Sequence, residues 1–304
     1  MKKLLSILIL YVFTFLLVCS AMAEAHYVTR FLTDDEAFPD CNAPEWADAM
    51  FVYFLGIGSQ DSILIVSGGK SMLIDCGNYY AGHDVYKRLN ALGINKIDYA
   101  VNTHPHNDHI LGFMTLLEHD INIETFYYAH NRDHNALMER FMSFADGISL
   151  NTVQISPADD ISFEGCDITL VRYPYINDAY TNNSSLVMKA AHGNNSVLLL
   201  ADITEDEEIA LAEQYGEKLK CDIMKLAHHG ITLTQYVFLK YVAPEFCVLT
   251  NNKSNTPVES LDKLEMYEQM YFSTTNGTLC CVSDGENWLV KQVKLTNDPY
   301  TMGP

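Results

Sequence analysis

The sequence predicts an α/β fold, and three observations carry this prediction. Short apolar runs separated by glycines follow residue 50, helical and strand-like patterns then alternate, and a strand-rich tail occupies residues 278–294. Alternation of the two periodicities is typical of sheets covered by helices. Because no repeat, low-complexity run or linker interrupts residues 51–304, we expect a single domain there.

The elements follow one another in a clear order. Glycines 56, 58, 68 and 69 break the first apolar runs into three short strands, which predicts a meander. Helical periodicity follows at 85–92, after His109 and at 135–144. Strands are expected at 51–57, 62–66, 71–74, 97–101, 124–128, 153–155, 168–171, 185–191, 196–200, 223–226 and 246–249.

Residues 1–23 have the features of an export signal. Lys2 and Lys3 precede an apolar run, and Ala21-Met22-Ala23 has the small-residue pattern of a cleavage site. We therefore expect a mature chain that begins near Glu24, with a weakly patterned lead over residues 24–50, in an extracytoplasmic location. An uncleaved membrane anchor is the alternative. No later apolar run is long enough for a span, so none is expected in the mature chain.

The charge balance argues against a nucleic-acid partner. Loss of Lys2 and Lys3 with the leader would leave 17 of the 19 Lys and Arg against 39 Asp and Glu, a net charge of −22. Proteins that neutralise a phosphate backbone need a basic stripe, and the sequence offers no Lys/Arg cluster to build one. The seven cysteines after Cys19 form no CxxC pair and lie mostly in apolar runs, where cysteine acts as a small hydrophobe.

The most informative motif is Thr103-His104-Pro105-His106-Asn107-Asp108-His109, directly after a strand-like run. Buried histidines and aspartates cost free energy unless they are paired or hold a metal, so this density predicts a metal site rather than a polar loop. Alternate residues of an extended segment share a face, which pairs His104 with His106, whereas Asp108 and His109 begin the next helix. The two pairs can therefore serve two neighbouring metals.

Two further strand ends carry candidate ligands. Asp202 follows the apolar run 197–201 and is free to bridge two cations, because Thr204 and Glu207 already supply a capping box for the next helix. His228 and His229 follow another apolar strand; one can bind metal while the other contacts substrate. His130 and His134 have helical spacing without a nearby acid, so we predict that they are surface residues.

In this order, the motifs resemble the metallo-β-lactamase superfamily. They are Leu73-Ile74-Asp75-Cys76-Gly77, residues 103–109, Leu200-Ala201-Asp202 and Ala227-His228-His229-Gly230. Within the superfamily, Asn182-Asn183-Ser184-Ser185-Leu186-Val187, the double histidine and Thr250-Asn251-Asn252 resemble the hydrolase domain of ComEC-type competence proteins and secreted phosphorylcholine esterases. Gly56-Ile57-Gly58-Ser59-Gln60-Asp61 keeps the family's later aspartate and lacks its earlier one.

The resemblance implies a four-layer αββα sandwich with two divalent metal ions, Zn or alternatively Mn or Fe. It assigns His104 and His106 to the first metal, Asp108 and His109 to the second, Asp202 as the bridge, and His228 or His229 to complete the second site. Asp75 would be a buried residue that orders the metal loop. Asn182-Asn183 stands where many members have a third histidine, and an amide is a poor zinc ligand, which favours a looser or manganese-binding first site.

These residues predict a metallo-hydrolase that uses a metal-activated water. Two cations would lower the pKa of a bridging water towards about 7, Asp108 would orient that water, and the non-ligand member of His228 and His229 would stabilise charge on the substrate. The leading interpretation is hydrolysis of a phosphodiester or other phosphoester of a small molecule or the cell envelope. The alternatives are a carboxylic-ester, lactone or β-lactam hydrolase and a non-catalytic protein that binds metal or a wall polymer.

Overall fold

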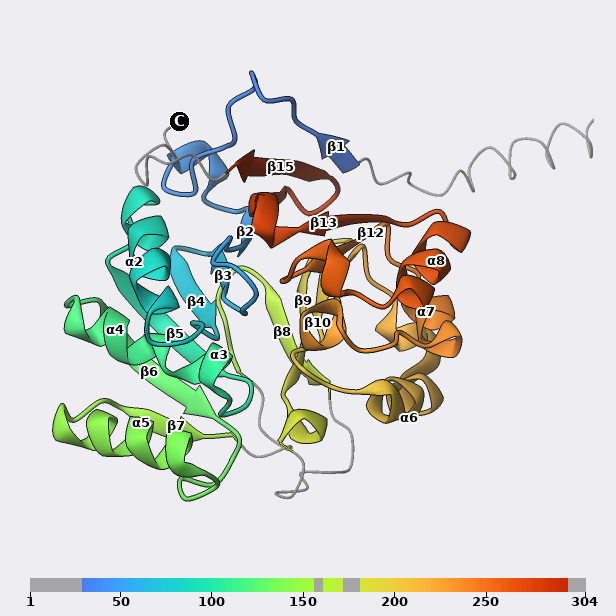
Figure 1. Cartoon of the computed structure of the whole chain (residues 1–304). Helices are drawn as coiled ribbons and strands as arrows, with labels where there is room; N and C mark the ends of the chain where they lie inside the picture. Colours follow the sequence, from blue (N-terminus) through green and yellow to red (C-terminus); the bar gives the residue numbers. More distant parts are fainter. Residues whose placement is uncertain (1–28, 156–160, 172–180, 295–304) are drawn as a thin grey trace, which may run out of the picture.

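Apolar residues face both sides of the central strands, and this pattern produces a layered molecule. In strand β2 (Met50–Phe54), Phe51 and Tyr53 belong to one buried cluster, whereas Val52 and Phe54 belong to another. Successive side chains of a strand point to opposite faces, so β2 is covered on both sides. The computed structural model, which describes residues 29–155, 161–171 and 181–294, shows how these faces are covered (Figure 1).

The first sheet has nine strands, and its centre is the predicted meander. Strands β2, β3 and β4 pair antiparallel, and β4, β5, β6 and β7 then continue in parallel. In sheet order the strands are β1 (Thr29–Phe31), β15 (Trp288–Lys294), β14 (Gly277–Ser283), β2, β3 (Ile63–Ser67), β4 (Lys70–Ile74), β5 (Lys96–Asn102), β6 (Asn122–Tyr128) and β7 (Thr152–Gln154). The lead contributes β1, which pairs with β15.

The second sheet has six strands and faces the first. Strands β8, β9 and β10 are antiparallel, and β10 to β13 run parallel. In sheet order they are β13 (Met270–Ser273), β12 (Phe246–Leu249), β11 (Ile223–Lys225), β10 (Asn195–Leu199), β9 (Val187–His192) and β8 (Asp167–Val171).

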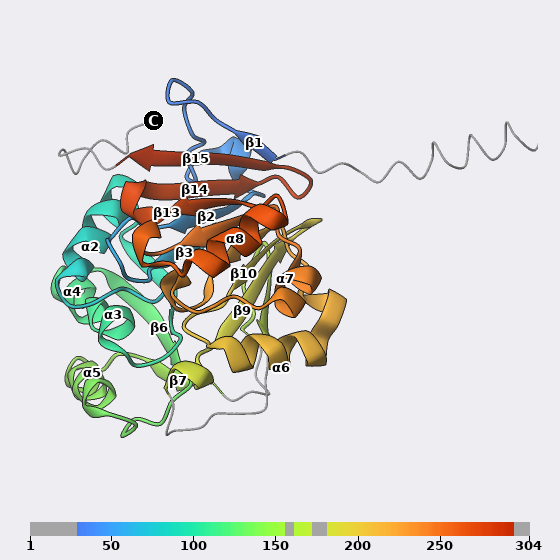
Figure 2. The same cartoon turned by 45° about the vertical axis from the view of Figure 1, so that its right-hand side comes forward.

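Helices cover the outer face of each sheet (Figures 1 and 2). The α-helices beside the first sheet are α2 (Ala81–Ala91), α3 (Asn107–Ile110), α4 (Gly112–Glu118) and α5 (Ala136–Gly147); those beside the second are α6 (Glu205–Tyr215), α7 (Tyr236–Val242) and α8 (Val258–Met266). Short 3-10 helices are η1 (Pro44–Trp46), η2 (Asn182–Ser184), η3 (Gly216–Leu219), η4 (Ala227–Gly230), η5 (Lys253–Asn255) and η6 (Thr274–Asn276).

Three buried apolar clusters fill the spaces between the four layers. One joins the first sheet to α2, α4 and α5, one lies between the sheets, and one joins the second sheet to α6, α7 and α8. Area-proportional burial of this kind, about 25 cal/mol per Å² of apolar surface, is the main stabilising term of a domain. The predicted α/β class and its αββα layering are confirmed.

Several local predictions can also be compared with the structure. The capping box at Thr204 and Glu207 is present at the start of α6. The seven described cysteines are free, and all but Cys41 are buried. The expected signal of residues 1–23 lies outside the described residues. Within residues 29–155, 161–171 and 181–294, no helix combines the length and apolarity needed to cross a bilayer.

Candidate metal centre

The strand register brings the predicted motifs to one edge of the two sheets. Ile74 of β4 pairs with Val101 of β5, so the loops after these parallel strands, which carry Asp75 and His104, start side by side. In the second sheet Leu199 of β10 pairs with Lys225 of β11, and Asp202 and His228 each follow three residues later. The carboxyl ends of neighbouring parallel strands meet at one edge. A backbone hydrogen bond of 2.8 Å from His228 N to Ala201 O joins the latter two loops.

Asp202 lies at the centre of the cluster, and its Oδ2 atom faces four imidazoles. The distances from this oxygen are 3.2 Å to His109 Nε2, 3.5 Å to His229 Nε2, 3.6 Å to His104 Nε2 and 3.7 Å to His228 Nε2. The Asp202 side chain is 2% exposed. One carboxylate oxygen is therefore shared by imidazoles from two segments, those that follow β5 and β11, which is the arrangement expected of a ligand that bridges two cations.

The remaining two predicted ligands border this centre. His106 Nδ1 lies 3.2 Å from His104 Nε2, and ligand atoms of His104, His106 and Asp202 all lie within 4.8 Å of one another. Asp108 Oδ2 lies 3.3 Å from His229 Nε2, and its side chain is 39% exposed. The structure thus brings all seven predicted metal residues together.

Asp75 holds the histidine loop in place. Its carboxylate accepts hydrogen bonds from Thr103 N at 2.9 Å and Thr103 Oγ1 at 2.6 Å, and its Oδ2 lies 2.7 Å from His109 Nδ1. This contact leaves Nε2 of His109 directed at Asp202. The predicted burial of Asp75 is confirmed, with 1% exposure.

Asp61 makes the same kind of contact to His229, and the sequence prediction did not place it in the site. Its Oδ1 lies 3.0 Å from His229 Nδ1 and also accepts a hydrogen bond from Thr250 Oγ1. Its Oδ2 pairs with the ammonium of Lys225, which is completely buried. The available clue was Lys225 itself, a charged residue in an otherwise apolar strand, since lysines are almost never fully buried without a partner.

Four residues of the site have left-handed backbone conformations. Asp75, Ala201, His228 and His229 have φ values of 55°, 48°, 50° and 56°. Such conformations are uncommon for residues other than glycine and cost free energy, about 1–3 kcal/mol at a strained position. Their concentration at the predicted motifs indicates that the loops are shaped by the site rather than by local preference.

The surroundings divide the five imidazoles into two electrostatic groups. Burial, together with neighbouring histidines, lowers the pKa of His104 and His106, and burial likewise lowers the pKa of His228 despite the nearby Asp202. Burial also acts to lower the pKa of His109 and His229, but their carboxylate neighbours outweigh it. As a result the pKa of His109 is raised well above its usual value and that of His229 to about 9.

His130 and His134 were expected on the surface, and the prediction was wrong for His130. His130 is 1% exposed, and its Nε2 lies 2.9 Å from Ser184 Oγ; His134 Nε2 lies 2.9 Å from Thr181 Oγ1. These contacts support the segment that carries Asn182, whose Nδ2 lies 3.5 Å from His228 Nε2. Both histidines precede α5 in a loop, so their helical spacing was misleading.

The buried polar atoms of this centre fit a bound cation. Among the described residues, Nε2 of His109, Nε2 of His229 and Oδ1 of Asp202 are buried and make no hydrogen bond. Such atoms are costly unless something satisfies them. Imidazole nitrogens with carboxylate oxygens are a donor set that suits Zn, Mn or Fe.

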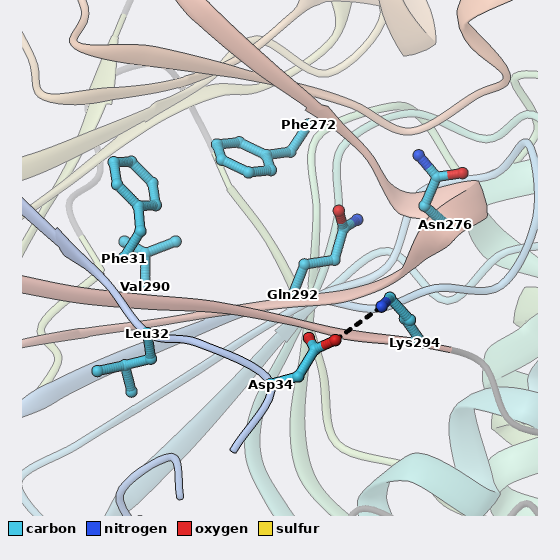
Figure 3. Close-up of a pocket in the computed structure, with 8 residues that line it drawn as sticks. All are labelled: Phe31, Leu32, Asp34, Phe272, Asn276, Val290, Gln292 and Lys294. Carbon is cyan, nitrogen blue, oxygen red and sulfur yellow. Dashed lines mark hydrogen bonds and ion pairs between the residues drawn. The ribbon is translucent and has the colours of Figure 1, made fainter. Parts of the chain in front are cut away.

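A separate cavity of about 510 Å³ lies elsewhere on the molecule (Figure 3). Its lining comes from β1, β13, β15 and nearby loops and includes none of the predicted site residues. An ion pair of 2.8 Å between Lys294 Nζ and Asp34 Oδ2 crosses one side of it. Nothing in its lining links it to the metal centre.

The chain is similar in sequence to known proteins. Residues 55–243 match the family model of the metallo-beta-lactamase superfamily. Competence protein ComA of Neisseria gonorrhoeae is 25% identical over 214 residues, which cover 70% of this chain and 28% of ComA. The chain therefore spans less than a third of that relative. These two matches confirm the resemblance inferred from the motifs.

The fold is also similar to that of a solved structure. A mutant of the beta-hydroxylase CmlA superposes with a TM-score of 0.51 and 12% identity, covering 81% of this chain and 54% of that one. The metallo-beta-lactamase fold protein YhfI from Bacillus subtilis has a TM-score of 0.49 and 15% identity, with 74% and 96% of the two chains covered. At 12% identity the likeness to CmlA concerns the fold alone.

Proposed function

Because this chain belongs to the metallo-beta-lactamase superfamily, whose members are generally metallo-hydrolases, we propose that it hydrolyses phosphoesters with the help of two divalent cations. Two bound cations would lower the pKa of a water between them and stabilise charge on the substrate oxygens. The observation that carries the proposal is the single oxygen of Asp202 that faces Nε2 of His104, His109, His228 and His229.

The geometry favours a particular division of ligands. His104 and His106 would hold the first cation, Asp108, His109 and His229 the second, and Asp202 both. His229 is the better candidate of the adjacent pair because Asp61 fixes its Nδ1, which leaves Nε2 3.3 Å from Asp108 and 3.5 Å from Asp202. A carboxylate behind the distal nitrogen is the usual support of a metal-binding histidine.

His228 and Asp108 are the residues that would meet substrate and water. Their side chains are 30% and 39% exposed, whereas those of His104, His109 and Asp202 are at most 2% exposed. The partly exposed Asp108 carboxylate can orient a water, and the imidazole of His228 can donate a hydrogen bond to a substrate oxygen.

A small or cell-envelope phosphoester is the substrate class that we favour. The resemblance of residues 182–187, 228–229 and 250–252 to phosphorylcholine esterases favours phosphorus chemistry, and the whole chain carries a net charge of −20. This charge repels a long polyanion, whereas the metals would still attract one phosphate at short range. Nucleic acid is therefore disfavoured. Carboxylic-ester, lactone or β-lactam hydrolysis is the alternative, because the same nucleophile attacks a carbonyl, and metal or wall-polymer binding without turnover is the other.

We place this activity outside the cytoplasm. In this proposal, residues 1–23 are a signal peptide, residues 24–50 a lead and residues 51–304 the hydrolase domain, as the Lys2-Lys3 pair and the apolar run favour. N-terminal sequencing of protein from the native host should find a start at or near Glu24 in an extracytoplasmic fraction. An intact Met1 in the cytosol would reject this location.

The function is tested with a panel of chromogenic substrates. Metal-loaded protein should hydrolyse bis-p-nitrophenyl phosphate or p-nitrophenylphosphorylcholine, and His106→Ala and Asp108→Ala should abolish turnover. His192→Ala and Asp84→Ala, which lie outside the centre, are the matched controls and should remain active. Cleavage of lactones or β-lactams without phosphoester turnover would favour the alternative. Efficient degradation of single-stranded DNA, lost in the same variants, would contradict the small-substrate proposal.

A further inference from the structure

A fully buried lysine lies directly behind the proposed metal centre. Lys225 shares its face of β11 with Ile223, which belongs to the cluster between the sheets, so its side chain points towards the first sheet. Its ammonium pairs with Asp61 Oδ2, donates a hydrogen bond of 2.8 Å to Ala201 O and lies 3.8 Å from Asp202 Oδ1. A buried ammonium is costly unless its surroundings compensate it, and these three oxygens do so.

Because of Lys225, the two carboxylate oxygens of Asp202 have different electrostatic surroundings. Oδ1 makes no hydrogen bond among the described residues and has the ammonium as its charged neighbour, whereas Oδ2 faces the four imidazoles. A carboxylate can bind metal through one oxygen or both. With a positive charge beside Oδ1, a cation is repelled from that oxygen and attracted only to Oδ2.

The same ammonium competes for Asp61. Ligand atoms of Asp61, His109, Asp202 and His229 all lie within 4.8 Å of one another, so this set could hold a cation by itself. Asp61, however, already contacts Lys225 through Oδ2 and His229 and Thr250 through Oδ1. It therefore supports His229 from behind and is not available as a ligand.

We propose that Lys225 is a positioning residue of this centre. Its ammonium prevents Asp61 and Oδ1 of Asp202 from binding the metals. This inference rests on the proposed metal centre. It adds that metal affinity is limited, because the lysine reduces the negative charge that the metals encounter. A lysine that only joined β11 to the loop of Asp61 would stabilise the fold without restraining metal affinity.

The test measures the affinity of the full mature chain for Zn²⁺ by competition with a chromophoric chelator. Lys225→Met keeps most of the length of the unbranched side chain and removes its charge, so it should bind Zn²⁺ at least about tenfold more tightly, or bind a third equivalent. Asp61→Asn should have the opposite effect and bind Zn²⁺ more weakly. The double variant should lie between the two single variants.

Lys263→Met is the matched control, because Lys263 is also buried but donates its hydrogen bond to Thr234 O, away from the centre. Its Zn²⁺ affinity should equal that of the wild type. Unchanged or weaker binding by Lys225→Met would overturn the inference. Should that variant fail to fold, unchanged or tighter binding by Asp61→Asn would overturn it instead.

The two proposals fail in different ways. A wild-type chain that binds two Zn²⁺ and hydrolyses no phosphoester would reject the proposed function, and the opposite shifts of the two variants would still decide the role of Lys225. A wild-type chain that binds none of Zn²⁺, Mn²⁺ and Fe²⁺ would reject both.

Discussion

His109 Nδ1 lies 2.7 Å from Asp75 Oδ2, and this contact decides which nitrogen of His109 faces the centre. Nε2 is left 3.2 Å from Asp202 Oδ2. Since Asp75 also accepts two hydrogen bonds from Thr103, one carboxylate determines both the path of the loop and the direction of its histidine.

Asp75→Asn should therefore weaken metal binding while the fold is retained. The amide keeps an acceptor for Thr103 but removes the charge behind His109, and loss of such a supporting carboxylate typically costs 10–100-fold in metal affinity. Equilibrium dialysis with Zn²⁺ measures the effect. Asp98→Asn, which changes a buried aspartate bonded to Ser71 and Lys70, is the control and should keep wild-type affinity. Equal losses in both variants would mean that the effect is general destabilisation.

The pH dependence of metal binding follows from His229. Asp61 and Asp202 overcome burial and raise the pKa of His229 to about 9, so below this pH a metal must displace a proton. Zn²⁺ affinity should then increase between pH 6.5 and 9, by up to about tenfold per pH unit for each displaced proton. Competition titrations across this range, with proton release in weak buffer, measure it. An affinity independent of pH over this interval would show that His229 is neutral before metal binds.

Linkage gives the metal-free protein the opposite trend. The folded pKa of His229 is raised above its unfolded value of 6.5, so its contribution to stability is fully present below pH 6.5 and is lost as the pH rises through about 9. As the pH rises, metal affinity therefore increases while the stability of the metal-free protein decreases, because the proton that stabilises the metal-free fold is the one that metal must remove.

Much of this centre could be predicted from local sequence. Four of the predicted ligands are neighbours in the chain: His104, His106, Asp108 and His109. Asp202 directly follows an apolar strand-like run, so a few adjacent residues were enough to identify each of these ligands. Asp61 could not be assigned in this way because its contact with His229 spans 168 positions. Which loops meet is determined by sheet register and packing between layers, and no local periodicity encodes either of them.

His130 illustrates the same limit from the other side. Its helical spacing to His134, without a nearby acid, suggested a surface position. In the structure α5 begins only at Ala136, where the Asn135 side chain accepts hydrogen bonds from Leu137 N and Met138 N. His130 instead reaches Ser184, 54 positions away. The start of α5 near residue 135 could be predicted from the local sequence. The burial of the loop before it could not, because it depends on the distant segment that contains Ser184.

Glu208 provides a stability test remote from the metals. It is completely buried in α6, where Oε2 accepts a 2.7 Å hydrogen bond from Gln235 N and Oε1 makes no hydrogen bond among the described residues. Burial raises its pKa to about 8, above its usual value of 4.5. The folded state therefore holds this proton more tightly, and the stabilisation present below pH 4.5 is lost as the pH rises through 8.

Glu208→Gln should remove this loss. The amide keeps an acceptor for Gln235 N without a charge, so at pH 8.5 the free energy of unfolding of the metal-free variant should exceed that of the wild type by about 1–3 kcal/mol. Urea unfolding at pH 5.5 and 8.5 measures the difference. Glu213→Gln, an exposed position of the same helix, should change little at either pH. Equal stability of Glu208→Gln and wild type at pH 8.5 would show that the buried carboxylate is otherwise compensated.

The adjacent histidines should separate metal binding from turnover. His229 is 6% exposed in its side chain and is fixed by Asp61, whereas the His228 side chain is 30% exposed and contacts Asn182 at 3.5 Å. His229→Ala should lose about one of two metal equivalents, since it removes a ligand of the second cation. His228→Ala should retain both and lower kcat by about 100-fold, the usual cost of losing one donor to a developing charge. Metal analysis of the dialysed variants beside kinetics on bis-p-nitrophenyl phosphate decides the matter. Loss of metal from His228→Ala, with metal retained in His229→Ala, would exchange the two roles.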